Sequence, residues 1–85
     1  MADFLRESRK ELDNIDYDLI KVLKKRLIVV KNIKKYKKEN GINIHDRERE
    51  KDLLQDRKSY AKNINISEDF IENIFLNLLD FVKKD

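Results

Sequence analysis

The sequence contains no cysteine, no proline, no tryptophan, one glycine and one histidine. Without cysteine the chain cannot form a disulfide or a cysteine-ligated zinc site, and a single histidine excludes a histidine-rich metal centre. β-Sandwiches and dinucleotide-binding α/β folds need more glycine and proline in their turns. No apolar run approaches the roughly 20 residues of a membrane span, and the first residues form no signal-peptide core. These absences predict one soluble, cytoplasmic domain over residues 1–85, without a metal or a membrane partner.

Charge dominates the residues that are present. Asp, Glu, Lys and Arg make up 44% of the 85 residues, yet the net charge is only +3. Disordered chains combine high net charge with few aromatic and β-branched residues, whereas this chain is rich in isoleucine and leucine. Interspersed charges of both signs are typical of helices with one solvated face. We therefore predict an all-α fold.

Two interruptions divide the helical pattern into one long helix and two shorter ones, over roughly residues 4–40, 47–62 and 68–84. The first interruption is Gly41, which follows a lysine-rich stretch and suits the left-handed position after a helix end. The second is the asparagine- and isoleucine-rich segment 63–66. Three helices per chain are therefore expected.

Side chains at the helix starts and along the two shorter helices support this division. Asp46 and Ser67 each offer an oxygen that can cap the following helix. Apolar residues at helical spacing predict core positions on each of the two shorter helices. The predicted core residues are Leu53, Leu54 and Ala61 of the second helix, and Phe70, Ile71, Ile74, Phe75, Leu78, Leu79 and Val82 of the third.

The long helix carries a seam with heptad spacing, which is typical of helices that pair with another helix. About 36 residues form a rod of roughly 54 Å, whereas a compact globule of this size is only about 30 Å across. Two shorter helices cannot cover such a rod, so we predict an intertwined helical homodimer in which the long helix pairs with its copy. The seam consists of Leu12, Leu19, Arg26 and Ile33 in one row and Ile15, Val22, Val29 and Tyr36 in the other.

Arg26 stands in this seam at a position that suits Leu or Ile. A buried guanidinium needs an anionic partner, although a polar residue that sets helix register or reaches the rim also fits the spacing. Lys37 follows eleven residues later, about 20° around the helix and about 16 Å along it. The two cations therefore share a face and can clasp a small dianion. Lys37 also fits the simpler role of a last-turn lysine that favours the helix dipole.

Three more charged residues fit an anion pocket. Arg9 lies roughly 25 Å from Arg26 and can reach that pocket only across an antiparallel pair of long helices; on its own it is an ordinary surface arginine. Arg49 and Glu50 border the apolar stripe of the second helix. They fit two interpretations: a solvated run of charges, or the polar rim of a pocket. Such a set suits an anionic small molecule, with catalysis by positioning and electrostatics. Nucleic acid is a weaker interpretation, because the cations are interleaved with acids.

One ordered set of residues runs through nearly the whole chain: segments 9–16 and 19–23, Arg26, Lys37 and segment 41–50. This set resembles the AroQ-type (all-helical) chorismate mutases, most specifically in the order Arg…Ile-Asp…Arg…Lys…Asp-x-x-Arg-Glu. The resemblance implies an intertwined dimer of three-helix chains. It also implies the rearrangement of chorismate to prephenate in phenylalanine and tyrosine biosynthesis, with no cofactor, metal or covalent intermediate.

The resemblance further implies a role for each site residue. Arg26 and the partner's Arg9 would hold the substrate's carboxylates. Lys37 would contact a carboxylate and the ether oxygen, where negative charge develops as the C–O bond breaks. Glu50 would accept the ring hydroxyl, helped by the backbone near Asp46.

The last part of the chain departs from the family pattern. The family commonly has a small hydroxyl residue, a further substrate contact, where Val82 stands, while Arg49 would support the substrate through water. Four positions beyond Val82 it has a Gln or Glu that donates to the ether oxygen, whereas this chain ends at Asp85. Loss of one such donor typically costs roughly 10² to 10³ in rate, so we expect reduced activity. The alternatives are an isochorismate-pyruvate lyase and a non-catalytic helical dimer that binds a metabolite or a protein.

Overall fold

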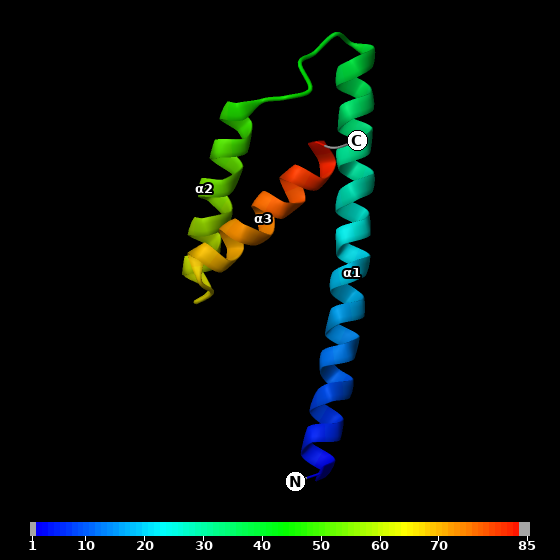
Figure 1. Ribbon diagram of the computed structural model, residues 1–85, viewed down its shortest axis with the longest axis vertical. Coiled ribbons are helices and arrows are strands. Elements are labelled where there is room, and N and C mark those ends of the chain that lie inside the picture. Colours follow the sequence, from blue (N-terminus) through cyan, green and yellow to red (C-terminus); the bar gives the residue numbers. More distant parts are fainter. Residues whose placement is uncertain (1, 84–85) are drawn as a thin grey trace. The chain divides into compact units, whose positions relative to one another are not determined.

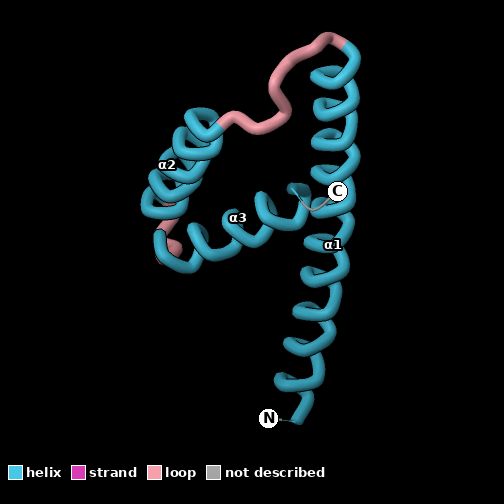
Figure 2. Tube along the Cα trace, turned by 45° about the horizontal axis from the view of Figure 1, so that its top comes forward, coloured by secondary structure: helices cyan, strands magenta, loops and turns pink. Residues whose placement is uncertain are grey.

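The computed structural model describes residues 2–83 of the chain, and these residues form three α-helices and no strand. α1 spans Ala2–Glu39, α2 Arg47–Asn63 and α3 Glu68–Lys83 (Figure 1). Only short connections separate the helices (Figure 2). The predicted all-α class, with one long and two shorter helices, is confirmed, while the predicted end of the third helix at residue 84 lies outside the described residues.

The chain divides after Tyr36 into two units: the first lies within α1, and the second contains the end of α1 together with α2 and α3. In the first unit the apolar side chains of the heptad seam are exposed to solvent in the single chain. Its seven apolar residues range in exposure from 48% for Ile33 to 61% for Tyr36. Burying this surface against another helix would be favourable, at roughly 25 cal/mol per Å² of apolar area.

α1 ends as the sequence predicts. Gly41 has φ +65°, in the left-handed region where residues other than glycine are strained. The amide of Ile42 donates to the carbonyl of Lys37, five residues earlier, at 2.8 Å. This is the 6→1 hydrogen bond of a Schellman cap. Lys37 and Lys38 lie in the last turn, where positive charge favours the helix dipole.

The turn from α2 to α3 is closed by the same kind of cap, with asparagine in place of glycine. Asn65 has φ +62°, a conformation that asparagine tolerates better than most residues. The amide of Ile66 donates to the carbonyl of Ala61 at 2.9 Å, and the amide of Asn65 to that of Lys62 at 3.1 Å. Ser67 then caps α3 through its Oγ, which accepts from the amide of Phe70 at 3.2 Å. The Ser67 cap was predicted, whereas the left-handed Asn65 was not.

α2 and α3 pack against each other as a helical hairpin. Among the described residues only Leu53 and Ala61 of α2 are buried, at 7% and 2% exposure. The predicted core is wrong for Phe70 and Ile74, which are 58% and 37% exposed. The reason is geometric: a two-helix hairpin has a single seam, and the apolar stripe of α3 is wider than α2 can cover. The remaining predicted core residues, Leu54, Ile71, Phe75, Leu78, Leu79 and Val82, are half-buried.

Two lysine–glutamate pairs join α2 to α3. Lys83 Nζ lies 3.0 Å from Glu50 Oε2, and Lys58 Nζ lies 2.9 Å from Glu72 Oε2. The hydrogen bond to Glu72 and the charge of Glu72 raise the pKa of Lys58, against an opposing effect of desolvation. The residue nearer the start of α2, Glu50, pairs with the end of α3, and the later residue, Lys58, pairs with the start of α3. The two helices therefore run antiparallel, and the pairs connect them at two levels.

Candidate active site

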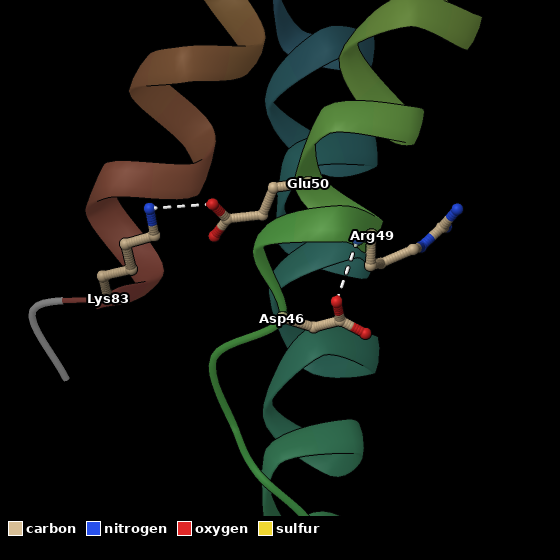
Figure 3. A network of polar contacts seen from close by, with 4 residues as sticks. All are labelled: Asp46, Arg49, Glu50 and Lys83. Atoms are coloured by element: carbon tan, nitrogen blue, oxygen red, sulfur yellow. Dashed lines mark hydrogen bonds and ion pairs between the residues drawn. The ribbon is translucent and has the colours of Figure 1, made fainter.

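The first turn of α2 is organised by Asp46. This residue is extended, with φ −124° and ψ 95°, and its Oδ1 accepts from the amide of Arg49 at 3.0 Å (Figure 3). It is therefore the N-cap that the sequence predicts. Glu48 and Glu50 also lie in the first turn, where negative charge favours the helix dipole. The backbone at the start of α2 is held by this cap, which orients the side chains that follow it.

Glu50 points from α2 toward the end of α3. Its amide donates to the carbonyl of Asp46 at 3.1 Å, within the helix. Its carboxylate meets Lys83, 33 residues later in the sequence, in a hydrogen bond of 3.0 Å between Nζ and Oε2 (Figure 3). The Glu50 side chain is 26% exposed and that of Lys83 is 41% exposed. This is a charge-assisted bond between two helices, with an exposed lysine and a half-buried glutamate.

Sequence reasoning did not single out Lys83. It is one of many lysines, and no periodic pattern distinguishes it. A signal did exist in the topology: in an antiparallel hairpin closed by a four-residue turn, the end of the third helix returns to the start of the second. Only the pairing of the two helices brings Lys83 to Glu50.

Arg49 and Val82 lie close in sequence to this pair but differ from it in orientation and chemistry. The side chain of Arg49 is exposed and extends away from Glu50 and Lys83 (Figure 3). Val82 is half-buried and precedes Lys83 at the end of α3. The structure therefore brings Glu50 to the last turn of α3, while Arg49 is turned to solvent.

The cations of α1 differ in burial. Arg26 and Lys37 are half-buried, whereas Arg9 is exposed. Arg9 lines an open hollow on the surface of α1, together with its helical neighbours. Apart from Ser8, the half-buried described residues of α1 follow one strip along the helix, namely Leu23, Arg26, Val30, Lys34 and Lys37.

The candidate residues are distributed over both units. Arg9 and Arg26 belong to the first unit, and Lys37 belongs to the second with Asp46, Arg49, Glu50 and Val82. Their convergence into one pocket stays a prediction. Among residues 2–83 no group of three or more histidine, aspartate or glutamate side chains is placed to hold a metal ion. In the same range, no helix is both long and apolar enough to cross a membrane.

These positions can be set beside known proteins. A family model for chorismate mutase type II matches residues 8–84. A chorismate mutase from Methanocaldococcus jannaschii is 32% identical over 83 residues, covering 98% of this chain and 84% of its own length. The chain belongs to the chorismate mutase type II family. The resemblance seen in the sequence is thereby confirmed.

Two further relatives are much longer proteins. The T-protein of Haemophilus influenzae is 39% identical over 70 residues, which cover 82% of this chain and 19% of that protein. A bifunctional chorismate mutase/prephenate dehydratase from Buchnera aphidicola is 35% identical over 72 residues, covering 85% and 19%. The chain thus spans about a fifth of the length of these two relatives. No solved structure gives a significant match.

The matches support the main functional prediction, a chorismate mutase domain. The reduced rate, the lyase alternative and the non-catalytic alternative find no support in them. The expectation of a cytoplasmic protein stays a prediction.

Proposed function

We propose that this chorismate mutase type II domain converts chorismate to prephenate, as an isomerase of aromatic amino-acid biosynthesis. The observation that carries the proposal is a pair of half-buried cations, Arg26 and Lys37, spaced eleven residues apart on α1. Both cations lie on the half-buried strip of α1, and the substrate implied by the family carries two carboxylates that such cations can bind. The family match across residues 8–84 supports the same conclusion.

The reaction needs no covalent bond between the protein and the substrate. Chorismate rearranges within itself: a C–O bond breaks and a C–C bond forms, without a nucleophile or a cofactor. The protein contributes by holding the reactive conformation and by stabilising the charge that develops on the ether oxygen. A set of cations with one carboxylate is sufficient for this task.

Each candidate residue has a proposed role. Arg26 and the partner's Arg9 bind the carboxylates, and Lys37 binds a carboxylate and the ether oxygen. Glu50 accepts the ring hydroxyl. The capped first turn of α2 supports this role, because the hydrogen bond from the Arg49 amide to Asp46 fixes the backbone that carries Glu50.

Asp46, Arg49 and Val82 have supporting roles in the proposed site. The backbone near Asp46 assists Glu50, and Arg49 acts through water, which agrees with its exposed side chain. Val82 stands at the position of a further substrate contact. No cofactor or metal takes part.

The proposal includes an intertwined homodimer in which residues 1–85 of each chain form one domain. The family match from residue 8 to residue 84 supports this extent. The open heptad seam of α1 supports pairing of α1 with its copy. In an antiparallel pair, Arg9 of one protomer approaches the site of its partner. Sedimentation velocity tests this assembly, and a stable, well-folded monomer would contradict it.

The catalytic proposal is tested by following chorismate loss in the ultraviolet with purified protein and identifying the product. We expect prephenate above the uncatalysed background, and a loss of about 10² or more in kcat/KM for Arg26→Ala and for Lys37→Ala. Lys24→Ala, a lysine on the face opposite the seam, is the matched control and should retain activity. Turnover that both pocket variants leave unchanged would refute the assignment of the site.

A further inference from the structure

Among the described residues near the proposed site, Glu50 and Lys83 form an ion pair that the mechanism proposed above does not use. Its two residues lie on different helices, and Nζ to Oε2 measures 3.0 Å (Figure 3). The pair resembles the Lys58–Glu72 bridge in composition and length. It differs in place, because one partner is the carboxylate proposed to accept the substrate's hydroxyl.

A glutamate that accepts a substrate hydroxyl has to be ionised and aimed. Its side chain rotates about three bonds and, when exposed, samples several rotamers. The Lys83 ammonium restricts this freedom by binding Oε2. A carboxylate has acceptor sites on both oxygens, so Oε1 remains available for a second donor. One oxygen is thus fixed by the protein and the other is presented to a ligand.

The charge balance leads to the same conclusion. The proposed substrate is a dianion, and a lone carboxylate beside it would repel it. Paired with Lys83, Glu50 adds no net charge to its surroundings and keeps its capacity to accept hydrogen bonds. The Lys83 ammonium therefore lets a carboxylate stand in a site that binds anions.

We propose that Lys83 is a positioning residue for this site: its Nζ holds Glu50 through Oε2, so that Oε1 accepts the substrate's ring hydroxyl. This inference rests on the proposed function. It assigns Lys83 a role through Glu50, and not through direct contact with the substrate's carboxylates.

The test compares Lys83→Met with Lys58→Met, which removes the matched bridge between the same two helices. The hydroxyl is not part of the bond that breaks, so its hydrogen bond is made equally in ground state and transition state. Loss of such binding raises KM and leaves kcat nearly unchanged. We expect KM for chorismate to rise about 10-fold in Lys83→Met, to stay unchanged in Lys58→Met, and to return close to wild type in Lys83→Arg.

A double-mutant cycle with Glu50→Gln separates the possible roles of Lys83. If Lys83 acts through Glu50, Lys83→Met adds no further rise in KM when Glu50 is already Gln. An equal rise in both backgrounds would mean that Lys83 binds the substrate itself, and would overturn the proposal. Far-ultraviolet circular dichroism and thermal melts establish that each variant is folded.

Two further outcomes are decisive in different ways. A melting temperature lowered in Lys83→Met with no change in KM would show a merely structural bridge, and would overturn the inference alone. Wild-type protein that neither converts nor binds chorismate would overturn the proposed function, and the role of Lys83 with it. The wild-type assay therefore distinguishes the two failures.

Discussion

Helix α1 and the α2–α3 hairpin are both amphipathic, yet within the described chain only the hairpin buries apolar side chains. Leu53 and Ala61 lie between α2 and α3, and two lysine–glutamate pairs join those helices. The seam of α1 is about half exposed along its whole length. The hairpin buries a small core through contacts within one chain, although part of the α3 stripe stays exposed. The pattern of α1 suits contacts from another chain.

The largest effect is expected from a charge placed in the seam of α1. Leu19→Asp puts a carboxylate into the proposed helix pair, twice per dimer by symmetry. An unpaired carboxylate in an apolar seam costs about 4 kcal/mol or more, so we expect dimer dissociation to increase at least about 10³-fold. Sedimentation velocity over a range of concentrations measures this.

Lys24→Asp is the control for that substitution, because Lys24 lies on the opposite face of α1. It should leave the sedimentation coefficient unchanged. Equal dissociation of both variants would mean that α1 does not pair through this seam. Pairing with another chain would then not explain why the seam is exposed.

Arg26→Leu separates the assembly role of the seam from its chemistry. Leu is the residue that the heptad pattern favours here, so the dimer should persist. The proposed site loses a carboxylate-binding cation, and kcat/KM should fall by about 10² to 10³. Steady-state kinetics and sedimentation on the same sample measure both properties. Retained activity with an intact dimer would show that Arg26 is a structural seam residue.

Leu53→Ala tests the packing of the hairpin. Leu53 is 7% exposed, and truncation of a buried leucine typically costs about 2 to 4 kcal/mol. Urea unfolding should show this loss, while Leu76→Ala, at a position 40% exposed, should cost about 1 kcal/mol or less. Similar losses at the two positions would indicate that another chain covers Leu76 of α3 as fully as α3 covers Leu53 of α2.

The smallest effect concerns Lys58 and alkaline pH. The pKa of Lys58 is raised by Glu72, so folding favours its charged form. This contribution to stability is fully present below the unfolded-state pKa near 10.5 and is lost as the pH rises through the higher folded-state value. The melting temperature of wild type should exceed that of Lys58→Met slightly and equally at about pH 7 and about pH 9. The difference should shrink above 10.5, and a constant difference there would exclude this linkage.

Much of the fold was predictable because its signals are local. The cap after α1 requires a left-handed residue, which Gly41 provides, and Asp46 and Ser67 cap the helices that follow them. Each of these features involves residues within about five positions of one another, so the sequence carries them directly. The left-handed Asn65 was missed because asparagine is common in turns of several conformations.

Features that depend on how the helices pack against one another were not predictable in the same way. Spacing placed Phe70 and Ile74 in the core, but one partner helix covers only part of the stripe on α3. Among the candidate site residues, Glu50 was selected from its place beside an apolar stripe and by family resemblance. Nothing in that selection indicated its partner at Lys83.

By itself the sequence determined the three helices, the caps at Gly41, Asp46 and Ser67, the heptad seam of α1 and the one cation, Arg26, that interrupts it. These features follow from propensity, capping and periodicity along one chain. The tertiary structure decided that α2 and α3 run antiparallel and that Lys83 meets Glu50. It also decided that Arg49 turns away from them. The physical reason is that side chains 33 residues apart meet only after two helices have packed, and helical periodicity carries no information about that pairing.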